Sequence, residues 1–124
     1  IGLKNPLYKN KEQKFNSPAF NFDEVVTLPS NAVCLASNKI NKIQSLYFNV
    51  GDTRIWGLQY HPEITYEKMI SLIEFRKDKL IENRKVFKDT EEVKKHISFI
   101  KKEILVTNKE KRMLELKNWL NQLS

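Results

Sequence analysis

The sequence has few of the residues that build disulfide frameworks or membrane spans. Its one cysteine, Cys34, cannot form an internal disulfide, so we expect a reducing compartment, the cytoplasm. No apolar run approaches the roughly 20 residues that cross a bilayer, and we therefore expect no membrane partner. With 40% hydrophobic residues and 3 glycines among 124 residues, the chain still has the composition of a folded domain.

Arginine is scarce in an otherwise basic chain. Lys and Arg number 22 against 15 Asp and Glu, for a net charge of +7, and 18 of the 22 are Lys. Nucleic-acid recognition favours the forked arginine guanidinium, whereas the lysines here are mixed with acids, as in KDTEEVKKH. We interpret them as solvated helix faces and expect no nucleic-acid partner. The alternative is a nucleic-acid binder that uses residues 89–123, and it predicts binding that weakens steeply with salt.

The first half of the chain has the pattern of β-strands. Residues 32–37 alternate larger and smaller apolar side chains, which suits a strand packed on both faces. Two β-rich runs, residues 43–50 and 53–60, are joined by Gly51 and Asp52, which is a strong hairpin signal. We therefore predict a β-rich part over residues 1–64.

After this part the apolar spacing becomes helical. Thr65 is expected to cap a first helix, and Asp89 and Thr107 each stand three residues before a glutamate, the spacing of a capping box. We predict about three helices over residues 65–124, so that the whole chain is one α/β unit. The apolar face of the last helix would comprise Met113, Leu116, Leu120 and Leu123.

The segment Trp56–Glu63 ends in a histidine and a glutamate on either side of a proline. Pro62 fixes one backbone angle and holds His61 extended, and residues at i and i+2 of an extended segment point the same way. The Glu63 carboxylate can therefore reach the imidazole, set its tautomer and leave the other ring nitrogen free as a base. Taken alone, the pattern also fits a strand-end histidine whose acidic neighbour caps the next helix.

The string WGLQYHPE resembles the closing motif of class I glutamine amidotransferases, in which His-Pro-Glu carries two members of a catalytic triad. The run FDEVVTLPSNAVCLASN is similar to a further segment of this family. IGL at the start is similar to a segment of stand-alone members related to the glutaminase domain of GMP synthase. The resemblance implies the later, C-terminal portion of one three-layer, flavodoxin-like α/β domain. Its β-rich part would be residues 1–64, and its helical part residues 65–124.

Two features depart from the family pattern. Asn21 stands where members usually carry a histidine, two residues before the aspartate, here Asp23. The family's nucleophilic cysteine, in a G-x-C-x-G turn, has no counterpart in these 124 residues. Cys34 lies within an apolar run without a neighbouring glycine, and we interpret it as structural. Because the chain also starts at Ile1 rather than methionine, we expect the cysteine in an N-terminal portion outside it.

The resemblance implies an enzyme that hydrolyses the side-chain amide of glutamine and releases ammonia, which would pass to a synthetase. A cysteine thiolate from the N-terminal half of the domain would attack the amide, with His61 as general acid and base and Glu63 as its orienting carboxylate. No cofactor is implied, and no metal site, since His96 has no partner at ligand spacing. The alternative is a non-catalytic regulatory or scaffolding module of the same fold, for which Asn21 and the absent cysteine would be true losses.

Overall fold

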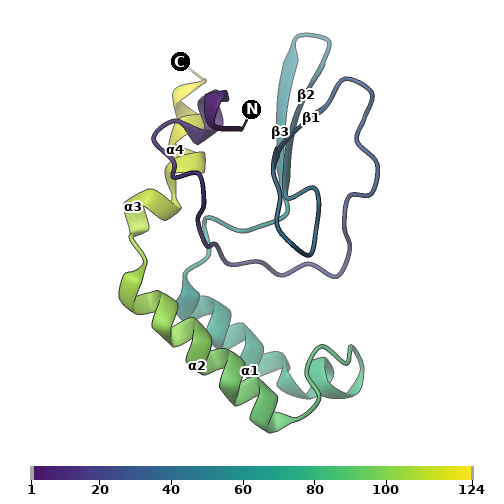
Figure 1. The fold of residues 1–124 in the computed structure, drawn as a ribbon, viewed down its shortest axis with the longest axis vertical. Coiled ribbons are helices and arrows are strands. Elements are labelled where there is room, and N and C mark those ends of the chain that lie inside the picture. Colours follow the sequence, from purple (N-terminus) through teal and green to yellow (C-terminus); the bar gives the residue numbers. More distant parts are fainter. Residues whose placement is uncertain (1, 124) are drawn as a thin grey trace. The chain divides into compact units, whose positions relative to one another are not determined.

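The computed structural model describes residues 2–123 as a mixed α/β chain (Figure 1). Ile1, the first residue of the IGL segment, lies outside the described residues, as does Ser124. Three strands and four α-helices follow two short 3-10 helices, η1 (Gly2–Lys4) and η2 (Pro6–Tyr8), in this part of the chain. The chain divides into two compact units: the first is Ile1–Glu63 with Glu110–Ser124, and the second is Ile64–Lys109.

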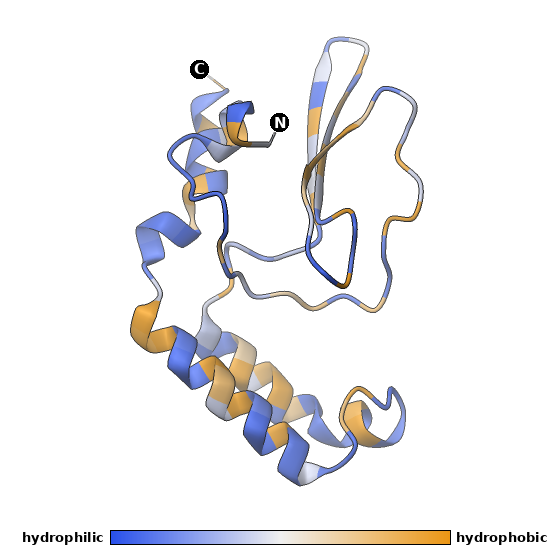
Figure 2. Cartoon of the chain, in the orientation of Figure 1, coloured by the Kyte–Doolittle hydropathy of each residue, from blue (hydrophilic) through white to orange (hydrophobic). Residues whose placement is uncertain are grey.

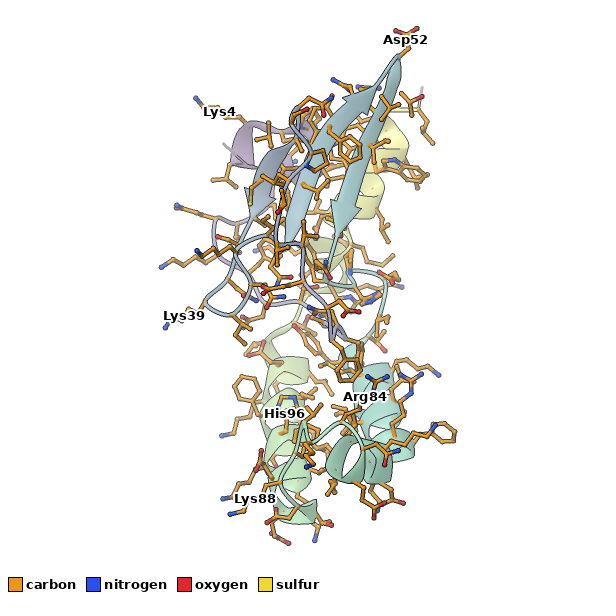
Figure 3. The ribbon with its side chains drawn as sticks, turned by 90° about the vertical axis from the view of Figure 1, so that its right-hand side faces the viewer. Lys4, Lys39, Asp52, Arg84, Lys88 and His96 are labelled. Atoms are coloured by element: carbon orange, nitrogen blue, oxygen red, sulfur yellow. The ribbon has the colours of Figure 1, made fainter. Side chains whose placement is uncertain are left out.

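The strands of the first unit form one antiparallel sheet in the order β1–β2–β3, comprising β1 (Val33–Ala36), β2 (Ser45–Val50) and β3 (Thr53–Leu58). The predicted hairpin is confirmed, because β2 and β3 pair across the two-residue loop of Gly51 and Asp52. Gly51 has a φ of +58°, whereas Asp52, at the tip of the hairpin in Figure 3, does not have a positive φ. A positive φ at the first central residue alone is the pattern of a type II′ turn, which glycine favours.

Val33–Ala36 forms a strand as predicted, but the prediction that this strand is packed on both faces is wrong. Val33 is exposed, and the rest of β1 is only half-buried. The physical reason is its place in the sheet, since β1 lies at one edge of the strand order and pairs there with β2. Its register shifts between Cys34 and Ala36, and such irregularities are common at sheet edges.

The buried core of the first unit forms around two tyrosines. Tyr8 and Tyr60 are buried together with Leu7, and neighbouring apolar side chains pack against them. The Tyr8 hydroxyl lies 2.7 Å from the Tyr60 hydroxyl and 2.6 Å from Ser45 Oγ, so these buried polar groups are paired. Burial raises the pKa of both tyrosines, which keeps the two hydroxyls protonated.

The second unit is a pair of helices, α1 (Tyr66–Glu82) and α2 (Thr90–Val106), that pack against each other. Two of the three predicted N-caps are confirmed: Thr65 Oγ1 accepts from Lys68 N–H at 3.0 Å, and Asp89 Oδ1 accepts from Glu92 N–H at 2.9 Å. Hydrophobic and hydrophilic residues alternate along both helices (Figure 2). Within the described residues, no helix combines the length and the apolarity needed to cross a membrane. The apolar side chains buried in this unit are Tyr66, Ile73, Phe87, Val93, Ile97 and Ile100.

The last predicted helix is divided in the structure. It forms α3 (Lys109–Arg112) and α4 (Leu114–Asn121), which are separated at Met113. Thr107, which was expected to cap this helix, instead ends α2, where its N–H donates to the Glu103 carbonyl. The structure therefore has one α-helix more than the sequence predicts.

The buried face of α4 also differs from the prediction. Leu120 and Leu123 are 57% and 67% exposed, whereas the polar Glu115 and Asn118 are buried. The reason is the polar surface that this helix meets, because Asn118 Nδ2 donates to the carbonyls of Leu7 and Lys9 at 2.8 and 2.9 Å. The polar side chains are therefore buried against backbone acceptors of the N-terminal segment, and the leucines remain outside.

Candidate active site

β3 leads into the His-Pro-Glu segment, whose backbone is held by an earlier part of the chain. Tyr60 is buried and forms an antiparallel bridge with Ala19. The His61 N–H donates to the Pro18 carbonyl at 2.7 Å. On the same side, the Phe20 ring packs 6.3 Å from the His61 ring, tilted by 55°. Residues 18–20 therefore fix both the backbone and the ring of His61.

His61 and Glu63 are in direct contact. Nδ1 of His61 lies 2.7 Å from Oε1 of Glu63, the length of a charge-assisted hydrogen bond. An ionised carboxylate can only accept, so this bond requires a proton on Nδ1 and leaves Nε2 of the neutral ring as an acceptor. The side chains are 38% and 49% exposed, which leaves the imidazole accessible to a reacting group. The structure thus has the contact that the spacing predicts, while the catalytic roles of the two residues stay a prediction.

Arg112 is part of the same site, although the sequence analysis did not identify it. It is 8% exposed, and its Nε donates to the Pro62 carbonyl at 3.1 Å. The two residues are 50 positions apart in the sequence. One signal was available, since Arg112 is one of only four arginines in a lysine-rich chain, but nothing near it indicates a partner.

The two residues that depart from the family pattern make local contacts. The Cys34 thiol donates to the carbonyls of Ala36 at 3.4 Å and Lys42 at 3.5 Å. Asn21 Nδ2 donates to the Asp23 carbonyl at 3.0 Å. None of these three contacts involves His61 or Glu63, and the position of Cys34 within the edge strand β1 differs from the sharp turn that presents a nucleophile.

No group of three potential metal ligands among His, Cys, Asp and Glu occurs within residues 2–123. His96, labelled on α2 in Figure 3, packs against two aromatic rings, with its ring centre 5.3 Å from Phe87 and 6.3 Å from Phe99. Burial lowers the pKa of His96, which favours its neutral form. His96 therefore belongs to the packing of the second unit.

A cavity of about 450 Å³ lies beside Tyr8 and Tyr60, but His61 and Glu63 are not among its lining residues. Ligand sites are usually concave, so this cavity is an alternative location for a ligand. We base the site on the His61–Glu63 pair instead, because the pair has an acid–base geometry that the cavity walls lack.

The fold and this pair define a mixed α/β chain that carries a hydrogen-bonded histidine and carboxylate at a strand end. The chain is similar to a gamma-glutamyl-L-1-hydroxyisopropylamide hydrolase from a Pseudomonas species, with 38% identity over 64 residues. The match covers 52% of this chain and 21% of that hydrolase, so the matched part spans about a fifth of the relative's length. No protein-family model matches the chain, and no solved structure gives a significant match.

Proposed function

We propose that this chain supplies the acid–base half of the active site of an enzyme that hydrolyses γ-glutamyl amides, of which glutamine is the simplest. The 2.7 Å contact between His61 Nδ1 and Glu63 Oε1 carries the proposal. It is supported by the resemblance of WGLQYHPE to the class I glutamine amidotransferase motif. It is further supported by similarity to a hydrolase whose name specifies a γ-glutamyl amide.

In the proposed reaction a cysteine thiolate attacks the γ-amide carbon and forms a tetrahedral intermediate. The protonated His61 gives a proton from Nε2 to the leaving nitrogen, so that ammonia or an amine departs and a thioester remains. Neutral His61 then takes a proton from water, which attacks the thioester and releases glutamate. Glu63 accepts the hydrogen bond from Nδ1–H throughout. It stabilises the imidazolium that is present before the leaving nitrogen departs and again after water has given up its proton.

The remaining parts of the proposal lie outside this chain. The cysteine and the backbone N–H groups that hold the oxyanion would come from an N-terminal half of the same domain, completing a flavodoxin-like fold. With glutamine as substrate, the ammonia would pass to a synthetase, as in GMP synthase-like members of the family. With a substituted amide, the amine itself would be the product.

The test is hydrolysis by the full-length gene product, measured as glutamate released from glutamine and from a γ-glutamyl alkylamide. His61→Ala should lower kcat about 10²- to 10⁴-fold, because it removes the general acid and base. Glu63→Gln should lower it less, since the amide oxygen can still accept from Nδ1. His96→Gln is the matched control and should leave kcat unchanged, because His96 packs in the other unit.

Unchanged hydrolysis in the His61→Ala protein would overturn the proposed role of this residue. A folded full-length protein that releases glutamate from neither substrate would instead favour the non-catalytic module. In that case Asn21 would mark one of the active-site residues that the chain has lost, because family members usually carry a histidine at this position.

A further inference from the structure

We propose that Arg112 is a positioning residue that orients Glu63 toward His61 by holding the Pro62 carbonyl. Its effect on catalysis rests on the proposed function, whereas its effect on the geometry of the pair does not. The relevant contact is the 3.1 Å hydrogen bond from Arg112 Nε to the Pro62 carbonyl oxygen, which is buried.

Few backbone rotations separate the two members of the pair. The peptide bonds on either side of Pro62 are planar, the proline ring fixes its own φ, and the residue before a proline is restricted to extended conformations. The rotation ψ of Pro62 is therefore the freest angle between the two Cα atoms. Rotation about ψ of Pro62 turns the peptide plane that contains the Pro62 carbonyl and the Glu63 nitrogen. The direction of the carbonyl therefore determines the position of the Glu63 Cα atom, from which the side chain extends.

Both ends of this short segment are held. At its start the His61 N–H donates to the Pro18 carbonyl, and at its end the Pro62 carbonyl accepts from Arg112. The second bond is charge-assisted and shielded from water, since Arg112 is 8% exposed and the Pro62 side chain is fully buried. Such a bond is stronger than a neutral bond at the surface. The carbonyl is therefore kept in one direction.

Arg112 itself is held from both sides. Before it in the chain, the Lys111 carbonyl accepts from Lys11 Nζ at 2.8 Å. After it, Glu115 Oε1 lies 2.7 Å from the same Nζ, and Asn118 is bonded to the N-terminal segment. The backbone from which the Arg112 side chain extends is therefore held in place. A residue that positions a catalytic group needs such support.

Two substitutions of Arg112 separate the hydrogen bond from the bulk of the side chain. Arg112→Gln places an N–H donor at the same number of bonds from the backbone as Arg112 Nε. Arg112→Met places a methyl group there, with a similar length and no donor. Arg54→Met is the matched control, because Arg54 is an exposed arginine of the same unit that contacts Gln122 in the terminal segment.

The readout is the tautomer of His61, measured from the ring ¹⁵N chemical shifts of histidine-labelled full-length protein. Its signals are identified by their loss in His61→Ala. The wild type, Arg112→Gln and Arg54→Met should show the form protonated at Nδ1. Arg112→Met should shift toward the tautomer mixture that we expect when the carboxylate is removed in Glu63→Ala.

An unchanged tautomer in folded Arg112→Met would overturn the proposal. If that variant does not fold, Arg112→Gln decides: a wild-type tautomer supports the proposal, and a lost one overturns it. In an active enzyme we further expect Arg112→Met to lower kcat about 10- to 100-fold, with KM little changed. The tautomer can be read even if no hydrolysis is found, so failure of the positioning role and failure of the proposed function remain distinguishable.

Discussion

At the scale of single residues, buried charges fasten the end of the chain to its beginning. Lys11 and Glu115 form an ion pair at 2.7 Å with side chains that are 4% and 0% exposed. The two charged groups are in close contact, and both carboxylate oxygens of Glu115 are buried. The attraction between the two charges stabilises this contact, and removal of the cation should lower the free energy of unfolding strongly.

Replacing Lys11 with methionine should reduce the free energy of unfolding by about 3–5 kcal/mol, because it leaves a buried carboxylate unpaired. Urea denaturation measures this change. Lys111→Met is a close control, since Lys111 pairs with Glu12 at 2.8 Å on the surface, and the loss of a solvent-exposed pair should change stability little. If the free energy of unfolding falls equally in the two variants, the buried Lys11–Glu115 pair stabilises the fold no more than a surface pair does.

His96 should make stability depend on pH. Burial lowers the pKa of His96 in the folded state, whereas in the unfolded chain its pKa is about 6.5. The folded state therefore binds this proton less readily, so stability is full above about pH 6.5 and falls as the pH decreases toward the folded-state pKa. In His96→Gln, the difference in unfolding free energy between about pH 7.5 and 5 should be smaller than in the wild type. An identical difference would contradict this assignment.

At the scale of elements, most predictions that rest on contacts between near neighbours are confirmed, with the exception of Thr107, which ends α2 instead of capping the next helix. The side chains of Thr65 and Asp89 cap the helices that follow them, and Gly51 gives the hairpin its positive φ. Each of these contacts joins residues within a few positions of one another. The face of α4 depends on residues 7–11, about a hundred positions earlier, and the prediction for it was wrong.

Gly51→Ala should cost about 1–2 kcal/mol, because a non-glycine residue is strained in the left-handed region. Apart from Gly51 and its two chain neighbours, no residue has an atom within 4 Å of the added Cβ, so the cost would come from the backbone conformation. Gly57→Ala is the comparison, since its Cβ would lie 3.4 Å from a Leu46 methyl, an ordinary contact. Thermal unfolding should therefore show a clear loss for Gly51→Ala only, and a larger loss at Gly57 would argue against this account.

At the scale of the whole molecule, several large apolar side chains remain at the surface. On and beyond α4 these are Trp119, Leu120 and Leu123, and elsewhere they include Val26, Ile40, Phe75 and Leu105. Clustered apolar surface binds hydrophobic dyes and favours association. The 124-residue chain alone should therefore have surface properties unlike those of a self-contained domain.

We expect this chain alone to bind the dye ANS. The substitutions Leu120→Lys and Leu123→Lys together should reduce the fluorescence, because they place charges in the exposed leucine surface of the terminal segment. Ser98→Lys, which adds a charge at an exposed polar position of α2, should change it little. If the double variant binds as much dye as the parent chain, the dye binds elsewhere.

Features whose causes lie within a few residues could be predicted from the amino-acid sequence. The β-hairpin, the two N-caps and the His61–Glu63 contact across Pro62 all follow from backbone preferences and near-neighbour geometry. The contacts between polar groups that are far apart in the sequence became known from the three-dimensional fold. These are the hydrogen bond from Arg112 to the Pro62 carbonyl and the burial of the polar face of α4, and the position of β1 at the sheet edge is of the same kind. All three depend on partners that no local pattern specifies.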